Sequence, residues 1–159
     1  MTFYQRRLPH WHPVGKILFI TWRLYGSLPS GVFKESEMGK MFALADRYLD
    51  SVEEGPLWLK ENQIAQQVCQ TIQFGEQYLK LYKLYAFVVM ANHVHLLIEP
   101  FVGLRKITRI IKGFTAREAN KILSKKRKKF WQEESFDHWV RNESELRRIQ
   151  RLELVLFSV

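Results

Sequence analysis

The chain has 159 residues, of which 47% are hydrophobic, and this is enough apolar material for one folded domain rather than a disordered chain. A single cysteine excludes a disulfide framework and a multi-cysteine zinc site. The net charge of +9 is uneven, because the segment from Phe101 onward holds 15 basic and 7 acidic residues, whereas the first 100 residues hold 10 and 9. A basic C-terminal third suggests a polyanionic partner, most often nucleic acid.

No apolar run reaches the ~18 residues that a membrane-spanning helix needs. The N-terminus also lacks the apolar stretch of a secretory signal. Because the one cysteine in addition fits a reducing compartment, we expect a cytoplasmic protein.

The first half of the chain predicts an extended arm, a strand and two helices. Residues 1–15, rich in arginine, histidine and proline, are the arm. Partly alternating β-branched and aromatic residues from Lys16 to Tyr25 predict the strand. Apolar residues spaced at about 3.6 predict helices over residues 34–53 and 57–79, with a Gly-Pro pair between them.

The second half predicts a hairpin, a helix, a strand and a last helix. Strands over residues 81–90 and 93–99 are separated by two residues, which is typical of a β-hairpin. Helical spacing follows over residues 104–123, then a short strand over 136–141 and a short helix from 143 to about 151. This order indicates one α+β domain over residues 1–159, with an antiparallel sheet of the split βαβ kind.

His93 and His95 are the sharpest chemical feature of the sequence. Alternate residues of a strand share a face with their Cα atoms roughly 7 Å apart, so both imidazoles project to one side while Val94 points into the core. Two imidazole nitrogens at this spacing can converge on one metal ion, which could act as a Lewis acid on a phosphodiester oxygen. The alternative is that both histidines merely occupy a sheet face.

Four blocks of the chain resemble, in order and spacing, the REP-associated tyrosine transposases, which are small single-tyrosine transposases of the histidine-hydrophobic-histidine (HUH) type. The blocks are YQRRLPHWHPVGKILFITWRLYGSLP, AFVVMANHVHLLIEP, LRKITRIIKGFTAREANKIL and FWQEESFDHWVRNESELRRI. The resemblance implies a ferredoxin-like antiparallel sheet with helices packed on one face, and binding of single-stranded DNA folded into hairpins. It also implies that His93 and His95 hold Mg²⁺ or Mn²⁺. A tyrosine on the last helix would then nick and rejoin one strand through a 5′-phosphotyrosine.

The end of the chain departs from this family at the decisive point. Relatives continue as Tyr-Ile-Glu-x-Asn-Pro, in which the tyrosine is the nucleophile and the asparagine completes the metal site. Here Leu152 stands at the tyrosine position and Leu156 at the asparagine position, within an atypical tail over residues 152–159. All six tyrosines precede His93, and leucine offers neither a nucleophilic atom nor a lone pair. The catalytic residue is therefore unknown, and we expect the chain to lack strand cleavage.

The helix predicted over residues 104–123 has a basic face that could contact DNA phosphates. Its members are Arg105, Lys106, Arg109, Lys112 and Arg117. A basic loop follows at residues 125–129. The alternative interpretation is an ordinary solvated helix face.

Three functions remain open at this point. The first is a transposase-family protein that binds single-stranded or hairpin DNA with Mg²⁺ or Mn²⁺ at His93 and His95. The second is a non-catalytic relative, domesticated or decayed, that recognises a nucleic-acid hairpin. The third is an RNA-binding protein, because attraction to phosphate carries no information about the sugar. The sequence also leaves open whether the chain is a monomer or a homodimer.

Overall fold

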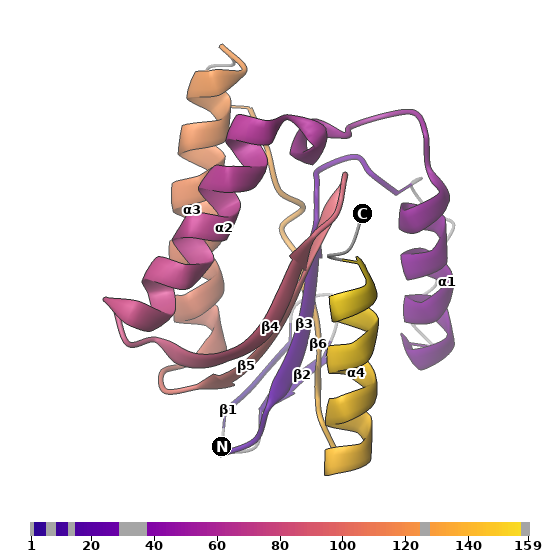
Figure 1. Cartoon of the computed structure of the whole chain (residues 1–159), viewed down its shortest axis with the longest axis vertical. Helices are drawn as coiled ribbons and strands as arrows, with labels where there is room; N and C mark the ends of the chain where they lie inside the picture. Colours follow the sequence, from indigo (N-terminus) through magenta and orange to yellow (C-terminus); the bar gives the residue numbers. More distant parts are fainter. Residues whose placement is uncertain (1, 6–8, 13–14, 29–37, 125–127, 157–159) are drawn as a thin grey trace.

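The computed structural model describes residues 2–5, 9–12, 15–28, 38–124 and 128–156, and it describes side chains over residues 15–28, 45–124 and 128–151. A four-stranded antiparallel sheet forms the centre of the molecule (Figure 1). Its strands lie in the order β4-β5-β3-β6, with bounds Leu18–Arg23 for β3, Tyr82–Val89 for β4, His93–Pro100 for β5 and Phe136–Trp139 for β6.

The connections follow the split βαβ pattern. β3 and β4 run parallel on either side of β5, and β5 and β6 run parallel on either side of β3, so helices cross over between the members of each pair. The predicted α+β fold of the ferredoxin-like kind is thereby confirmed.

One face of the sheet is covered by α2 (Asn62–Gln77) and α3 (Leu104–Ile122), as the prediction of helices on one face expects (Figure 1). The apolar stripes of the two helices bury Ile64, Val68, Ile72, Ile107 and Ile111. They pack on the even-numbered residues of β5, which are Val94, Leu96 and Ile98. Burial of these stripes removes apolar surface from water and makes this the larger of the two cores.

The opposite face of the sheet is also occupied, by α1 (Met38–Ser51) and α4 (Glu143–Leu156), which lie together on one side of it in Figure 1. A smaller core forms there from Leu97, Val140 and Ile149. The odd-numbered residues of β5 project to this side, because side chains alternate along a strand. The prediction that the helices pack on one face therefore holds for α2 and α3 only. Ile149 anchors α4 to the other face.

Three helices differ in extent from the predictions. The helix expected over residues 34–53 ends at Ser51, and its residues 34–37 lie outside the described residues. The helix expected over residues 57–79 is broken, because Glu61 has an extended backbone that separates a 3₁₀ turn (Trp58–Lys60) from α2. The last helix was expected to end near Arg151 but continues to Leu156. The added residues include no glycine or proline and are mainly leucine and glutamate, which favour helix.

Within the predicted N-terminal arm, the described residues 2–5 and 9–12 form two paired strands, and residues 1, 6–8 and 13–14 lie outside the described residues. β1 (Thr2–Gln5) and β2 (Pro9–His12) form a separate two-stranded antiparallel sheet, with Thr2 opposite His12. Among the described helices, none is both long enough and apolar enough to cross a membrane.

Candidate metal centre

Two buried imidazoles meet at the start of β5. His93 is 0% exposed and His95 is 4% exposed, and their Nε2 atoms are 3.1 Å apart. The rings are nearly perpendicular, at 81°, while Val94 between them points into the larger core. The pair thus has the shared face that strand alternation predicts.

Hydrogen bonds from behind fix the orientation of both rings. His93 Nδ1 lies 2.7 Å from Asn92 Oδ1, and Asn92 Nδ2 donates to the backbone carbonyl of Leu49 at 2.9 Å. Because Asn92 Oδ1 can only accept, His93 carries its proton on Nδ1 and leaves Nε2 with a free lone pair. His95 Nδ1 lies 2.7 Å from the hydroxyl of Thr21.

Helix α1 brings a carboxylate to this pair. Asp46 Oδ1 lies 3.2 Å from His95 Nε2 and 3.6 Å from His93 Nε2. Ligand atoms of these three residues lie within 4.8 Å of one another. Asp50, one turn further along α1, has Oδ1 3.5 Å from His93 Nε2, but its side chain is 45% exposed. The residues present therefore suit a divalent ion, with two imidazole nitrogens and at least one carboxylate oxygen.

Asp46 and Asp50 were not predicted as site residues from the sequence. Their spacing of four residues puts both carboxylates on one face of the helix predicted over residues 34–53. This shared face was the available sequence signal for a pair of acidic site residues. No local pattern, however, indicates which side of the sheet this helix covers.

The local environment sets the charge states of these groups. Burial, followed by the charge of His95, lowers the pKa of His93 to about 3, against an opposing effect of Asp46. Burial raises the pKa of Asp46, but the contact with His95 and the charges of both histidines outweigh it, and the net pKa is below its usual value. Burial and the charge of Asp46 raise the pKa of Asp50. At neutral pH, His93 is thus a neutral imidazole beside a carboxylate.

The described tyrosines of the neighbouring strand are poorly placed to act as nucleophiles here. Tyr82 is 0% exposed in the core under α2, where its hydroxyl donates to the carbonyl of Ile72 at 2.6 Å, and burial raises its pKa. Tyr85 is on the histidine side, but its hydroxyl contacts Glu99. It also lies three residues, or ~10 Å, before Val88, which pairs with His95.

The expected nucleophile position falls in the last helix. The backbone at Leu152 is helical within α4, on the same side of the sheet as the histidines (Figure 1). The side chains of Leu152 and Leu156 lie outside the described side chains.

The basic helix is on the other side of the sheet. Arg105, Lys106, Arg109 and Arg117 are solvent-exposed on α3. Lys112 is occupied, because its ammonium donates to the carbonyls of Gln132 and Glu133 and to the Ser135 hydroxyl. The sheet therefore separates this helix from the histidines, so the predicted metal ligands and the predicted basic face are on opposite sides of the sheet. Of the basic loop, residues 125–127 lie outside the described residues.

Arg23, which was not predicted as a site residue, lies on the same side of the sheet as the histidines. Arg23 stands opposite His93 in the β3–β5 register, and residues directly opposite in an antiparallel pair share a face. Its Nη1 donates to the hydroxyl of Ser27 at 3.3 Å. Only the strand pairing places Arg23 opposite His93.

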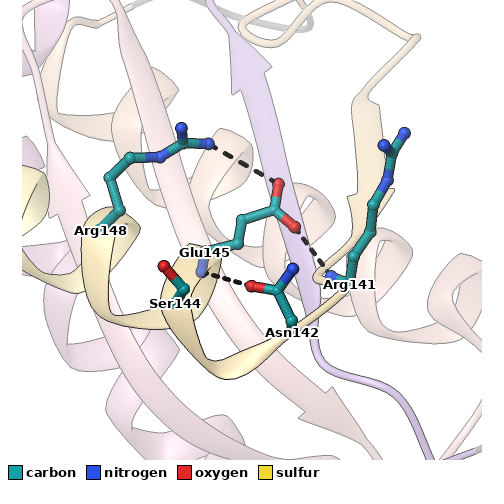
Figure 2. Close-up of a pocket in the computed structure, with 5 residues that line it drawn as sticks. All are labelled: Arg141, Asn142, Ser144, Glu145 and Arg148. Carbon is teal, nitrogen blue, oxygen red and sulfur yellow. Dashed lines mark hydrogen bonds and ion pairs between the residues drawn. The ribbon is translucent and has the colours of Figure 1, made fainter.

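A shallow pocket lies at the N-terminal end of α4 (Figure 2). Its polar groups are used to begin the helix: Asn142 Oδ1 accepts from the Glu145 amide, and Glu145 Oε2 accepts from the Arg141 amide. Glu145 Oε1 also lies 3.2 Å from His138 Nε2 on β6. These hydrogen bonds thus anchor the start of α4. The pocket is separate from the histidine pair.

Comparison with known proteins agrees with this geometry. The family model for IS200-like transposases matches residues 58–146, more than half of the chain. A REP-associated tyrosine transposase solved bound to a REP hairpin is 15% identical, with a TM-score of 0.54 over 98% of this chain and 72% of that one. A Deinococcus radiodurans R1 protein assigned as a transposase is 14% identical, with a TM-score of 0.51 over 88% of this chain and 89% of that one. No curated protein matches the sequence. At these identities the solved structures show a shared fold, while the family model shows the family. The chain belongs to the IS200-like transposase family.

Proposed function

We propose that this protein binds single-stranded or hairpin DNA at a divalent-metal centre built on His93 and His95, and that the chain as written does not cleave it. The observation that carries the proposal is the convergence of two buried imidazole nitrogens, 3.1 Å apart, in a chain of this family. The relative solved with a REP hairpin supports the choice of DNA as partner.

The residues at the site fit Mg²⁺ or Mn²⁺. Such an ion, when bound, supplies charge stabilisation and orientation for a phosphodiester. Thr21 and Asn92 hold the two imidazoles in place from behind, so their Nε2 atoms are positioned before any ligand arrives. Arg23, beside His93, offers a guanidinium for a second phosphate oxygen.

The exposed cations of α3 extend the surface for DNA. Arg105, Lys106 and Arg109 project from the face of α3 that does not pack on the sheet. A folded hairpin is wide enough to meet more than one face of a small domain, and phosphate contacts position a nucleic acid without reading its sequence. DNA would then contact both the histidine side and the α3 side.

The expectation of no cleavage rests on the residue at position 152 and on the placement of the two tyrosines of β4. A covalent protein–DNA bond needs a hydroxyl in line with the scissile phosphate. Tyr82 is buried under α2 and Tyr85 lies away from the histidines, while position 152 holds leucine.

The experiment compares labelled DNA and RNA hairpins of matched sequence, with Mn²⁺, on native and denaturing gels. We expect a shift of DNA on the native gel, weaker binding of RNA, and no covalent band on the denaturing gel. Replacing the residues from position 152 onward by Tyr-Ile-Glu-x-Asn-Pro should produce a covalent band. This replacement includes Leu152→Tyr and Leu156→Asn. A preference for RNA would overturn the choice of partner, and a covalent band from the unaltered chain would overturn the absence of cleavage.

A further inference from the structure

We infer that Asp46, presented by α1, is the third protein ligand of this metal centre and takes the place that relatives give to an asparagine on the last helix. The inference rests on the proposed metal site at His93 and His95. It means that this chain holds its ion between β5 and α1, independently of the residue at position 156.

The distances among the three donor atoms match a single coordination sphere. Two ligands at right angles on an octahedral ion 2.1 Å away are ~3.0 Å apart. The observed separations are 3.1 Å between the two Nε2 atoms, 3.2 Å from Asp46 Oδ1 to His95 and 3.6 Å to His93. One ion can thus contact all three atoms on one side and leave its other positions to water or phosphate.

The same three atoms share at most one proton among themselves. His93 Nε2 is an acceptor, because its other nitrogen donates to Asn92. Asp46 Oδ1 is also an acceptor; it is buried and makes no well-aligned hydrogen bond with any described residue. His95 Nε2 lies near both and has at most one proton to donate. Among the described side chains, one of the two acceptors therefore lacks a donor of its own, whereas a divalent ion would serve all three atoms.

Asn92 ties this carboxylate to the histidine pair. It is 1% exposed, and it accepts from His93 on one side and donates to the Leu49 carbonyl of α1 on the other. Leu49 is itself buried, at 4% exposed, and lies nearly one turn after Asp46. The side chain of Asn92 thus fixes the orientation of the His93 ring and also holds the helix that carries Asp46.

Asp50 provides the internal comparison. It lies on the same helix and carries the same carboxylate, but its closest approach is 3.5 Å to His93 Nε2 alone, and it is more exposed than Asp46, at 45% against 29%. We therefore place Asp50 at the open side of the site and not among the three ligands.

The test measures Mn²⁺ affinity in the absence of DNA, by electron paramagnetic resonance of free Mn²⁺. Asp46→Asn keeps the size of the side chain and should weaken Mn²⁺ binding by about tenfold or more, since loss of even an outer-shell partner has that effect. Asp50→Asn, the matched control, should weaken it clearly less. Leu156→Asn should leave affinity unchanged, because the third position is already filled.

The outcomes separate this inference from the proposed function. If Asp46→Asn binds Mn²⁺ as tightly as the parent while His93→Ala with His95→Ala does not bind, the metal site stands and Asp46 is not a ligand. A larger loss in Asp50→Asn than in Asp46→Asn, or a tighter site in Leu156→Asn, would also overturn the inference. If the parent itself binds no Mn²⁺, the proposed metal centre fails.

Discussion

At the scale of single residues, the proposed metal centre depends on Asn92, which joins two parts of the chain 43 residues apart. In the sequence, Asn92 lies in the predicted turn of the hairpin. The preference of asparagine for turns explains its presence there without any further role. The structure gives its side chain two buried hydrogen bonds that the turn does not need. Its function is therefore visible only after α1 is packed against the sheet.

Replacing Asn92 should damage both the site and the fold. Asn92→Ala leaves the Leu49 carbonyl and the His93 Nδ1 proton without their partner, so we expect a loss of about 1–3 kcal/mol in the free energy of unfolding. Because the ring of His93 is no longer held, Mn²⁺ affinity should also fall by about 10–100-fold. Urea denaturation and Mn²⁺ titration measure the two effects.

Asn142 offers the matched control for this change. It caps α4 by accepting from the Glu145 amide, so Asn142→Ala should cost about 1 kcal/mol of stability. It has no link to the histidines, and Mn²⁺ affinity should be unchanged. Equal losses of affinity in both variants would mean that general destabilisation, and not the lost hydrogen bonds, weakens the site.

At the scale of elements, the local patterns predict what the elements are better than where they end. The hairpin strands and α3 follow their predicted ranges closely, because β-branched runs and helical apolar spacing are local signals. The helix expected over residues 57–79 is interrupted, because burial of Leu59 in the 3₁₀ turn competes with continuous helical bonding. His93 and His95 could be predicted as a pair, but Asp46 and Arg23 join them through contacts distant in sequence.

The contact between α2 and β4 requires a glycine. A Cβ at Gly75 would overlap the Tyr82 phenol, whose hydroxyl is fixed on the Ile72 carbonyl of the same helix. Gly75→Ala should therefore lower stability by about 1–3 kcal/mol through overpacking, although alanine is the better helix former. Thermal or urea unfolding measures it.

A second helical glycine provides the comparison for Gly75. At Gly113 of α3, an added Cβ meets nothing within 4 Å. Gly113→Ala should stabilise the protein by up to about 1 kcal/mol through helix propensity alone. A stabilising effect at both positions would contradict the close packing of α2 on Tyr82.

At the scale of the whole molecule, charge and chemistry are distributed over two faces. The sequence shows that the C-terminal third is basic, but it does not show that α3 and the histidines lie on opposite sides of the sheet. That separation results from the alternation along β5, which sends even-numbered residues to α2 and α3 and odd-numbered residues to α1. Any nucleic acid that uses both features must extend around the edge of the domain.

The salt dependence of DNA binding tests whether α3 takes part. Replacing Arg105, Lys106 and Arg109 together by Gln should reduce the slope of log affinity against log salt by roughly 0.7 for each lost contact with a single strand. Lys112 is left in place, because its contacts with Gln132 and Glu133 are structural. Filter binding at several salt concentrations gives the slope.

An equal change of charge elsewhere is the control for the α3 variant. Lys60, Lys80 and Lys83 are exposed and lie outside α3, and their replacement by Gln should change the slope less. If the two triple variants give the same slope, the attraction reflects net charge and α3 makes no particular contact.

The position of β5 inside the sheet has a consequence for how the protein responds to metal loss. β5 is bonded on both edges, with Thr21 on β3 and Val88 on β4 flanking His95. Amide protons in such a ladder exchange with solvent only when the sheet opens as a whole. An ion leaving the side-chain face of β5 breaks none of these backbone bonds, unlike in a zinc finger, where the metal holds the fold together. Occupancy of the proposed centre would therefore follow the concentration of free metal while the same folded chain persists throughout.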